Sequence, residues 1–454
     1  MTNEPGRRAW TLLFTACCVV ATMFATGPGL ALTARKKSAI GQPAKASTMD
    51  TTATIYVKLV LALSQHDNDY VDAYYGPPAW KAEAAATEAT LSDIGGRAAD
   101  LIGTLEREPT PSAEIDRLRL HYLQRQLSAL LARARMLGGE RLSFDQESKA
   151  LYDAVAPTLP ESHFQEILDR LEKRFPGTGP LFERYEAFRR AFVIPSGRLD
   201  EVFRIAIQAC ADRTRAHMAL PAGESFRVEY VTNKSWSGYN WYQGNFRSVI
   251  QVNTDLPIYI DRAVDLACHE GYPGHHAYNV LLEQHMVKDR GWVEFTVYPL
   301  FSPQSLIAEG TANFGIEVAF PGVQRLIFER TVLFPAAGLD PRRAAEYYET
   351  QDLVDRLAYA GNEAARRYID GRLDAAEAAA WLQRYALMPR DRAVQRVKFF
   401  DQYRSYVINY NLGKDMVRRH IEARGGTTAA PAKRWGEFEK LISSPRLPSG
   451  LELR

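Results

Sequence analysis

The chain has 454 residues, of which 46% are hydrophobic, so it is long enough to fill the core of one large domain or two ordinary ones. Its 56 Lys and Arg residues nearly balance its 54 Asp and Glu residues, which leaves a formal net charge of +2. This composition excludes disorder of most of the chain, and the balanced charge gives no reason to expect nucleic acid as a partner.

The first 48 residues differ from the rest. Two arginines precede an apolar run over residues 9–25, and small residues follow it, a pattern typical of a secretory signal peptide. We therefore predict a signal peptide over 1–34, a disordered lead-in over 35–48, and export to the periplasm or the exterior. The alternatives are an uncleaved anchor or a lipid on Cys17, and we expect contact with a membrane only through one of these.

From residue 49 onward, apolar residues recur every three or four positions over most of the chain, which predicts helices. We expect helices from 49 and from about 91, and over 112–137, 162–175, 181–192, 199–219, 304–319, 341–370, 374–386 and 391–423. The proline- and glycine-rich stretch 176–180 predicts a boundary between two lobes. The first would be an N-terminal helical lobe, 49–176, and the second, 181–454, would carry the chemistry.

The hydrophobic period changes to two over residues 226–231 and 246–253, which predicts strands. The fold class is therefore mainly α, with a small β-hairpin or sheet next to the helix that carries the motif described below. An edge strand here could bind an extended peptide through main-chain hydrogen bonds, whereas the simpler interpretation is a hairpin that only packs on helices. Residues 254–257 predict the start of a helix that runs to the motif.

The motif occupies residues 268–276, with the sequence Cys-His-Glu-Gly-Tyr-Pro-Gly-His-His. It holds three of the nine histidines of the chain and one carboxylate within eight positions. Neutral imidazoles are common zinc ligands, and Glu270, next to His269, is placed to take a proton from an attacking water. The motif therefore predicts a zinc-dependent hydrolase.

The spacing after His269 requires a bend in the chain. Zinc peptidases commonly carry their second histidine at i+4, where this chain has Pro273. In an unbroken helix the i+6 position points away and the i+7 position lies about 10.5 Å along the axis, so neither could share an ion with the first histidine. Pro273 and Gly274 can bend the backbone and bring back His275 or His276. We prefer His275 as the ligand and leave His276 as a second ligand, an orienting group or a substrate contact.

The third ligand is expected to be Glu309, which lies in the apolar stretch 305–314, 40 positions after His269. The alternative is a surface or capping carboxylate, but a buried carboxylate without a partner would be costly. Asn313, one turn later, could hold Glu309 in place, and Glu317 is the substitute ligand.

Two further predictions concern groups around the ion. Tyr406 and Tyr410 are candidates for the donor that stabilises the oxyanion, and we prefer Tyr410. Cys210 and Cys268 follow the predicted signal peptide. They could form one disulfide in an oxidising compartment. Cys268 lies next to the motif, and we expect it to be a small buried residue on the inner face of its helix rather than a metal ligand.

The motif, with Tyr74-Tyr75-Gly76-Pro77 before it and Glu309-Gly310 and residues 406–414 after it, resembles a large bacterial family of unknown function. Its members are often exported and are taken to be helical zinc metallopeptidases akin to gluzincins. The resemblance covers nearly the whole chain after the predicted signal and implies a large two-lobed helical zincin-like fold. Carried over by position, the resemblance implies that His269, Glu309 and one or both of His275 and His276 bind the zinc. It also implies that Glu270 is catalytic.

We therefore expect a zinc peptidase that hydrolyses short peptides. The alternatives are a non-haem iron enzyme on a site of two histidines and one carboxylate, and a catalytically inactive peptide-binding protein. The sequence leaves open the substrate, the choice between internal and terminal cleavage, and the oligomeric state.

Overall fold

The first helix, α1 (Thr48–Leu63), begins with a reciprocal cap in which the Ser47 hydroxyl accepts from the backbone N–H of Asp50 and the Asp50 carboxylate accepts from that of Ser47. The computed structural model describes residues 47–234 and 236–452. The predicted signal peptide and nearly all of the predicted lead-in therefore lie outside the described residues. Within them, no helix is both long enough and apolar enough to cross a bilayer.

The helices of the first half follow the periodicity of the sequence. They are α1, α2 (Pro78–Thr87), α3 (Leu91–Glu106), α4 (Glu114–Leu137), α5 (Phe144–Tyr152), α6 (Glu161–Arg174), α7 (Leu181–Arg189) and α8 (Leu199–Arg215). The helices predicted up to residue 219 are confirmed, and α2 and α5 are additional. α2 begins at the second of two consecutive prolines, Pro77 and Pro78, because a proline is tolerated in the first turn of a helix.

The second half is also helical and carries the motif. Its helices are α9 (Asp261–Leu266), α10 (His275–Leu282), α11 (Pro303–Ala319), α12 (Val323–Phe328), α13 (Phe334–Ala337), α14 (Ala344–Val354), α15 (Ala360–Ile369), α16 (Ala375–Tyr385), α17 (Arg390–Tyr403), α18 (Ile408–Ala423) and α19 (Pro431–Ile442).

Three helix boundaries in this half differ from the prediction. The predicted start at residues 254–257 is wrong, because the Thr254 N–H bonds the Val231 carbonyl beside the sheet and α9 begins only at Asp261. The expected helix over 391–423 is interrupted at Arg404, whose φ of 50° is left-handed. The expected helix over 341–370 is divided into α14 and α15.

The strands form two small sheets. β2 (Ser225–Val231), β4 (Arg247–Asn253) and β3 (Gly238–Gly244) lie in the order β2-β4-β3, with β2 parallel and β3 antiparallel to β4. β1 (Val71–Tyr74) pairs antiparallel with β5 (Val297–Pro299). β3, which is rich in aromatic residues, lies between the two predicted strands in the sequence and forms an edge of its sheet. The predicted class, mainly α with a small sheet beside the motif, is confirmed.

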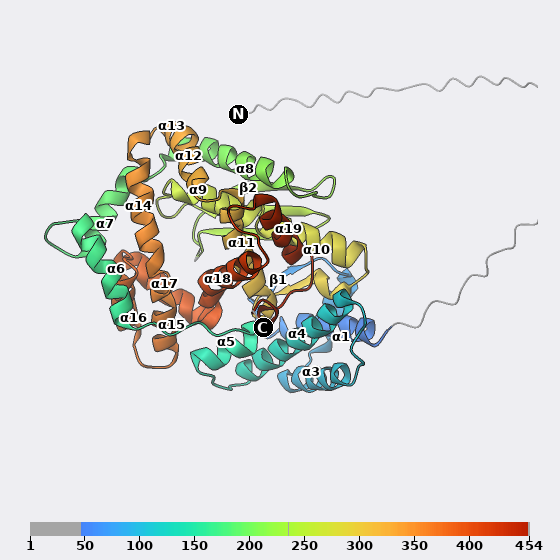
Figure 1. The fold of residues 1–454 in the computed structure, drawn as a ribbon. Coiled ribbons are helices and arrows are strands. Elements are labelled where there is room, and N and C mark those ends of the chain that lie inside the picture. Colours follow the sequence, from blue (N-terminus) through green and yellow to red (C-terminus); the bar gives the residue numbers. More distant parts are fainter. Residues whose placement is uncertain (1–46, 235, 453–454) are drawn as a thin grey trace, which may run out of the picture. The chain divides into compact units, whose positions relative to one another are not determined.

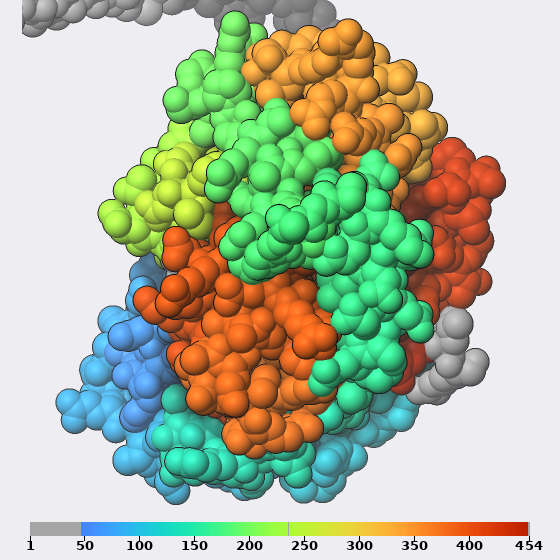
Figure 2. Space-filling model, turned by 90° about the vertical axis from the view of Figure 1, so that its left-hand side faces the viewer, coloured from blue at the N-terminus to red at the C-terminus, as the bar shows by residue number. Residues whose placement is uncertain are grey.

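The central packing relationship is between α11 and α18, which lie side by side (Figure 1). Nearly every residue of α11 is buried. A Cβ on Gly310 would lie 2.5 Å from the carbonyl carbon of Gly413, so the two backbones approach closely only because both positions are glycine. Elsewhere, α6 and α7, coloured green, lie beside α16, coloured orange (Figure 2).

Candidate metal centre

The motif folds as two helical segments joined by a sharp bend. α9 continues into a π-helical turn, Ala267–Gly271, which carries His269 and Glu270, and α10 begins at His275. A Cβ on Gly274 would overlap the backbone carbonyl oxygens of Cys268 and His269. Glycine therefore allows the start of α10 to fold back against the turn, and the predicted bend is confirmed.

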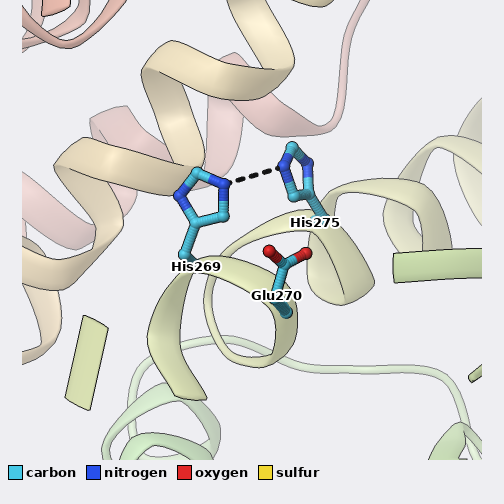
Figure 3. Close-up of side chains that lie close together, drawn as sticks. All are labelled: His269, Glu270 and His275. Carbon is cyan, nitrogen blue, oxygen red and sulfur yellow. Dashed lines mark hydrogen bonds between the residues drawn. The ribbon is translucent and has the colours of Figure 1, made fainter. Parts of the chain in front are cut away.

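The bend brings two imidazoles together. The Nε2 atoms of His269 and His275 lie 3.1 Å apart, and their ring planes are inclined by 87°. Figure 3 shows that the Glu270 carboxylate points toward the two rings. One ligand atom from each of these residues lies within 4.8 Å of the others. Of the two histidines that the sequence left open, the structure brings His275 to His269.

Glu309 reaches the same place from α11. Its Oε2 lies 3.3 Å from Nε2 of His269 and 3.8 Å from Nε2 of His275. Its Oε1 accepts a hydrogen bond of 2.8 Å from the Tyr406 hydroxyl. Glu309 is only 6% exposed, and its Oε2 has no hydrogen-bond donor among the described residues, because the approach of His269 lacks hydrogen-bond geometry. A buried carboxylate oxygen without a donor is the kind of atom that a cation would satisfy.

The charges of these groups suit a divalent cation. Burial lowers the pKa of His275 to about 4, and the neighbouring His269 acts in the same direction, so this imidazole is neutral at pH 7. Burial opposes ionisation of Glu309, but its contact with His269, the charge of that imidazole and the hydrogen bond from Tyr406 hold the pKa below the usual value. Burial raises the pKa of Glu270 to about 7. A neutral imidazole and an ionised carboxylate are the forms that bind zinc.

The spacing of the donor atoms also fits zinc. Bonds of about 2.0 to 2.2 Å in a tetrahedron place adjacent donors roughly 3.3 to 3.6 Å apart. The three separations among His269, His275 and Glu309 are 3.1, 3.3 and 3.8 Å. These three side chains could hold the ion and leave a fourth position open, with Glu270 beside it.

His276 lies outside this group. It is completely buried, its Nδ1 lies 2.8 Å from the Ser248 hydroxyl, and its Nε2 lies 2.9 Å from Oε2 of Glu224. Both ring nitrogens are therefore occupied at the sheet side of α10. The expectation that His276 also binds the metal is corrected: it ties the start of α10, and hence His275, to the sheet.

Three other predicted residues are now placed. Glu317, the substitute ligand, pairs with Lys414 and Arg418 instead. Asn313 donates to the backbone carbonyls of Glu309 and Tyr410, so it bridges α11 and α18 without touching the carboxylate. Tyr410 lines the same cavity as the metal-site residues, and nearby Glu309 and Glu270 add to burial in raising its pKa.

One buried pair near the site has no signal in the sequence. The Tyr239 hydroxyl of β3 donates to Asp72 of β1. Burial, together with the charge of Glu309, raises the pKa of Asp72 to about 7, although the hydrogen bond from Tyr239 acts in the opposite direction. Asp72 lies 197 positions before His269 and in no recognisable motif, so only the fold brings them near each other.

The site opens into a large cavity of about 2140 Å³, lined by the metal-site residues and by parts of β3 and α17. Ligand pockets commonly measure about 300 to 1,000 Å³, so this cavity has room for several residues of a peptide. β3 passes close to the site, since a Cβ on Gly238 would lie 2.9 Å from Oε1 of Glu270. An edge strand and the expected catalytic carboxylate thus line the same cavity.

A disulfide joins Cys210 of α8 to Cys268, the residue before His269. The bridge that the sequence left open is therefore present, and Cys268 is also completely buried, as predicted. The bridge connects the π-helical turn covalently to a helix 58 positions earlier in the chain.

No family model matches the sequence, and no curated protein matches it. Solved structures that resemble the chain include two that are named as lipoproteins. A "putative lipoprotein" from Colwellia psychrerythraea is 13% identical with a TM-score of 0.48, over 90% of this chain and 75% of that one. A "putative lipoprotein of unknown function" from Shewanella oneidensis is 13% identical with a TM-score of 0.43, over 89% and 82%. At this level of similarity, function must be argued from the chain's own residues.

Proposed function

We propose that the protein is a zinc-dependent peptidase that hydrolyses short peptides. The observation that carries the proposal is the convergence of His269, His275 and Glu309 on one point, with Glu270 beside it. When bound there, zinc would act as a Lewis acid toward the substrate carbonyl and would make a water easier to deprotonate.

The side chains around this point would have separate roles. Glu270 would accept the proton of the attacking water and deliver it to the leaving amine. A pKa of about 7 suits both steps at neutral pH. Tyr406 is engaged with Glu309, which leaves the Tyr410 hydroxyl as the group to donate to the developing oxyanion.

The β3 edge supports a peptide as the substrate. In the described residues, β3 pairs with β4 on one side, and residues 236–241 line the cavity. An extended chain beside this edge would receive main-chain hydrogen bonds whatever its side chains. Gly238 keeps that edge close to Glu270.

We also propose that the protein is exported. The predicted signal peptide supports export, and so does the Cys210–Cys268 disulfide, because structural disulfides persist mainly in oxidising compartments. The disulfide belongs to the turn that carries His269, so an oxidising environment would preserve the architecture of the site.

The test combines metal analysis with peptide cleavage. Protein purified without added metal should contain about one zinc per chain, whereas one iron per chain would favour the non-haem iron alternative. The zinc-loaded protein should cleave members of a mixed oligopeptide library, followed by mass spectrometry, and Glu270→Gln should not. If fully loaded wild-type protein cleaves no peptide, the proposed activity is wrong and a binding protein remains.

A further inference from the structure

Arg396, on α17, is an arginine of the cavity wall that lacks a counter-ion. It makes no ion pair and no hydrogen bond with another described residue, and its Nε atom is buried without a partner. Its guanidinium instead lies 4.5 Å from the centre of the Phe399 ring and 5.8 Å from that of Tyr410. Burial lowers the pKa of Arg396, with only the Tyr410 hydroxyl opposing it.

Two buried arginines in the described part of the chain, Arg119 and Arg366, are paired with carboxylates. Arg119 bonds Glu294 over 2.6 Å and also reaches Asp50, and Arg366 bonds Glu363 and Asp145. A buried cation without a counter-ion destabilises the fold, because its hydration is lost without compensation. Arg396 thus lacks the ion pair that Arg119 and Arg366 make, at a place that faces the cavity.

A second arginine lies on the same face of α17. Arg392, one turn earlier, also lines the cavity and makes no ion pair within the described part of the chain. Burial lowers its pKa, and the positive charges of Arg262 and Arg189 lower it further, against a weaker opposing effect of Glu186. This wall thus carries two arginines that make no ion pair with another described residue, and an anion would be attracted to them.

The position of Arg396 relative to the metal centre limits what that anion can be. The guanidinium of Arg396 lies against the Tyr410 ring. The centre of the Tyr406 ring lies 5.8 Å from the centre of the Tyr410 ring, and the Tyr406 hydroxyl donates to Glu309. A substrate held by Arg396 would therefore extend along the wall that carries the proposed oxyanion donor. A guanidinium matches a carboxylate with two parallel hydrogen bonds.

We propose that Arg396, with Arg392 beside it, binds a carboxylate of the peptide substrate, and that this is the terminal carboxylate, so the enzyme removes residues from the C-terminus. The inference rests on the proposed peptidase function. An acidic side chain near the cleaved bond would offer the same chemistry, and the test separates the two sources.

The test uses three peptides: a free acid without acidic side chains, its C-terminal amide, and the same amide with a glutamate in place of its last residue. Wild-type protein should cleave the free acid at least about tenfold more efficiently than either amide, because the loss of a hydrogen bond to a charged group lowers affinity by about that factor or more. Arg396→Gln should raise KM for the free acid by a similar factor, change kcat less, and leave the plain amide unaffected. Arg396→Lys should recover part of the loss.

Arg390→Gln is the matched control, since Arg390 begins the same helix, is exposed and does not line the cavity. It should behave as wild type. If wild type cleaves acid and amide equally, or if Arg396→Gln slows both alike, the inference is wrong. Efficient cleavage of the glutamate amide but not of the plain amide would support carboxylate binding and overturn removal of C-terminal residues.

A binding measurement separates this inference from the peptidase proposal. Calorimetry with Glu270→Gln protein should show tighter binding of the free acid than of the amide, and adding Arg396→Gln should abolish the difference. A preference that persists without Arg396 would refute the inference even if the protein is a peptidase. Cleavage of none of the peptides, with the Arg396-dependent preference intact, would refute only the peptidase activity.

Discussion

The Tyr406 hydroxyl donates to Oε1 of Glu309 over 2.8 Å, although the two residues are 97 positions apart. This bond turns the other carboxylate oxygen, Oε2, toward His269. The carboxylate is thus oriented by a neighbour that does not itself face the metal, as is common for metal ligands.

Tyr406→Phe should therefore weaken zinc binding by about 10- to 100-fold, which competition with a chelator of known affinity would measure. Tyr410→Phe is the matched control, because it removes a hydroxyl from α18 without touching Glu309. It should keep the metal affinity and lower kcat by about 10²-fold or more. Equal metal affinity in Tyr406→Phe and wild type would show that the carboxylate needs no such support.

Replacing His275 should affect zinc binding, whereas replacing His276 should affect stability. His275→Ala should lose bound zinc while keeping most of its stability, because the side chain is proposed to serve the ion. His276→Ala should lower the free energy of unfolding by about 2 to 4 kcal/mol, since it removes a buried ring, the partner of the Ser248 hydroxyl and one of the three partners of Glu224. Metal analysis and thermal unfolding of the metal-free proteins would show both. Full zinc content in His275→Ala would contradict the assignment.

Glu270→Gln should separate binding from chemistry. The amide keeps the size of the side chain but cannot accept the proton, so hydrolysis should fall by about 10²-fold or more at unchanged zinc content. The initial rate with a cleaved library peptide, together with metal analysis of the same sample, gives both quantities. Hydrolysis at the wild-type rate would remove Glu270 from the role of base.

Glu224 should make stability depend on acidic pH. The carboxylate is 5% exposed, and although burial opposes ionisation, its hydrogen bonds with His276, Arg215 and Tyr272 lower its pKa from 4.5 to about 2. A lowered carboxyl pKa stabilises the fold above the unfolded value and loses that effect as the pH falls through the folded value. Glu224→Gln should thus cost about 2 to 3 kcal/mol at pH 7, and less as the pH falls from 4.5 toward 2.

Denaturant unfolding of the metal-free proteins over this pH range would measure the effect. Glu229→Gln provides a control carboxylate at the exposed surface of the same sheet, and its effect should stay within about 0.5 kcal/mol. A difference between wild type and Glu224→Gln that is constant down to pH 2 would contradict the assigned pKa.

The sequence predicts the parts of this molecule that depend on local chemistry. Regular apolar spacing locates α4 and α11, and Pro273 with Gly274 indicates the bend that the structure contains. The apolar residues around Glu309 in the sequence predict that it is buried, as it is. Burial in turn indicates a partner, because an unpaired buried carboxylate is costly.

Other parts depend on contacts that periodicity does not encode. His275 and His276 are adjacent and chemically identical, and they are distinguished only by Ser248 and Glu224 from the neighbouring strands and loop. Asp72 and Arg396 come from segments distant in sequence, and nothing local marks either residue as part of the cavity wall. The break at Arg404 requires a left-handed residue that is not a glycine, which sequence patterns rarely indicate.

The close contact between α11 and α18 at Gly310 and Gly413 fixes the distance between the side chains that the two helices contribute to the metal centre. Glu309 precedes one of these glycines, and Tyr410 comes three positions before the other. A single methyl group inserted between the backbones would widen the spacing of ligand and hydroxyl together, although neither glycine carries any reactive atom. The positions of Glu309 and Tyr410 relative to each other thus depend on Gly310 and Gly413, because only residues without a side chain allow this contact.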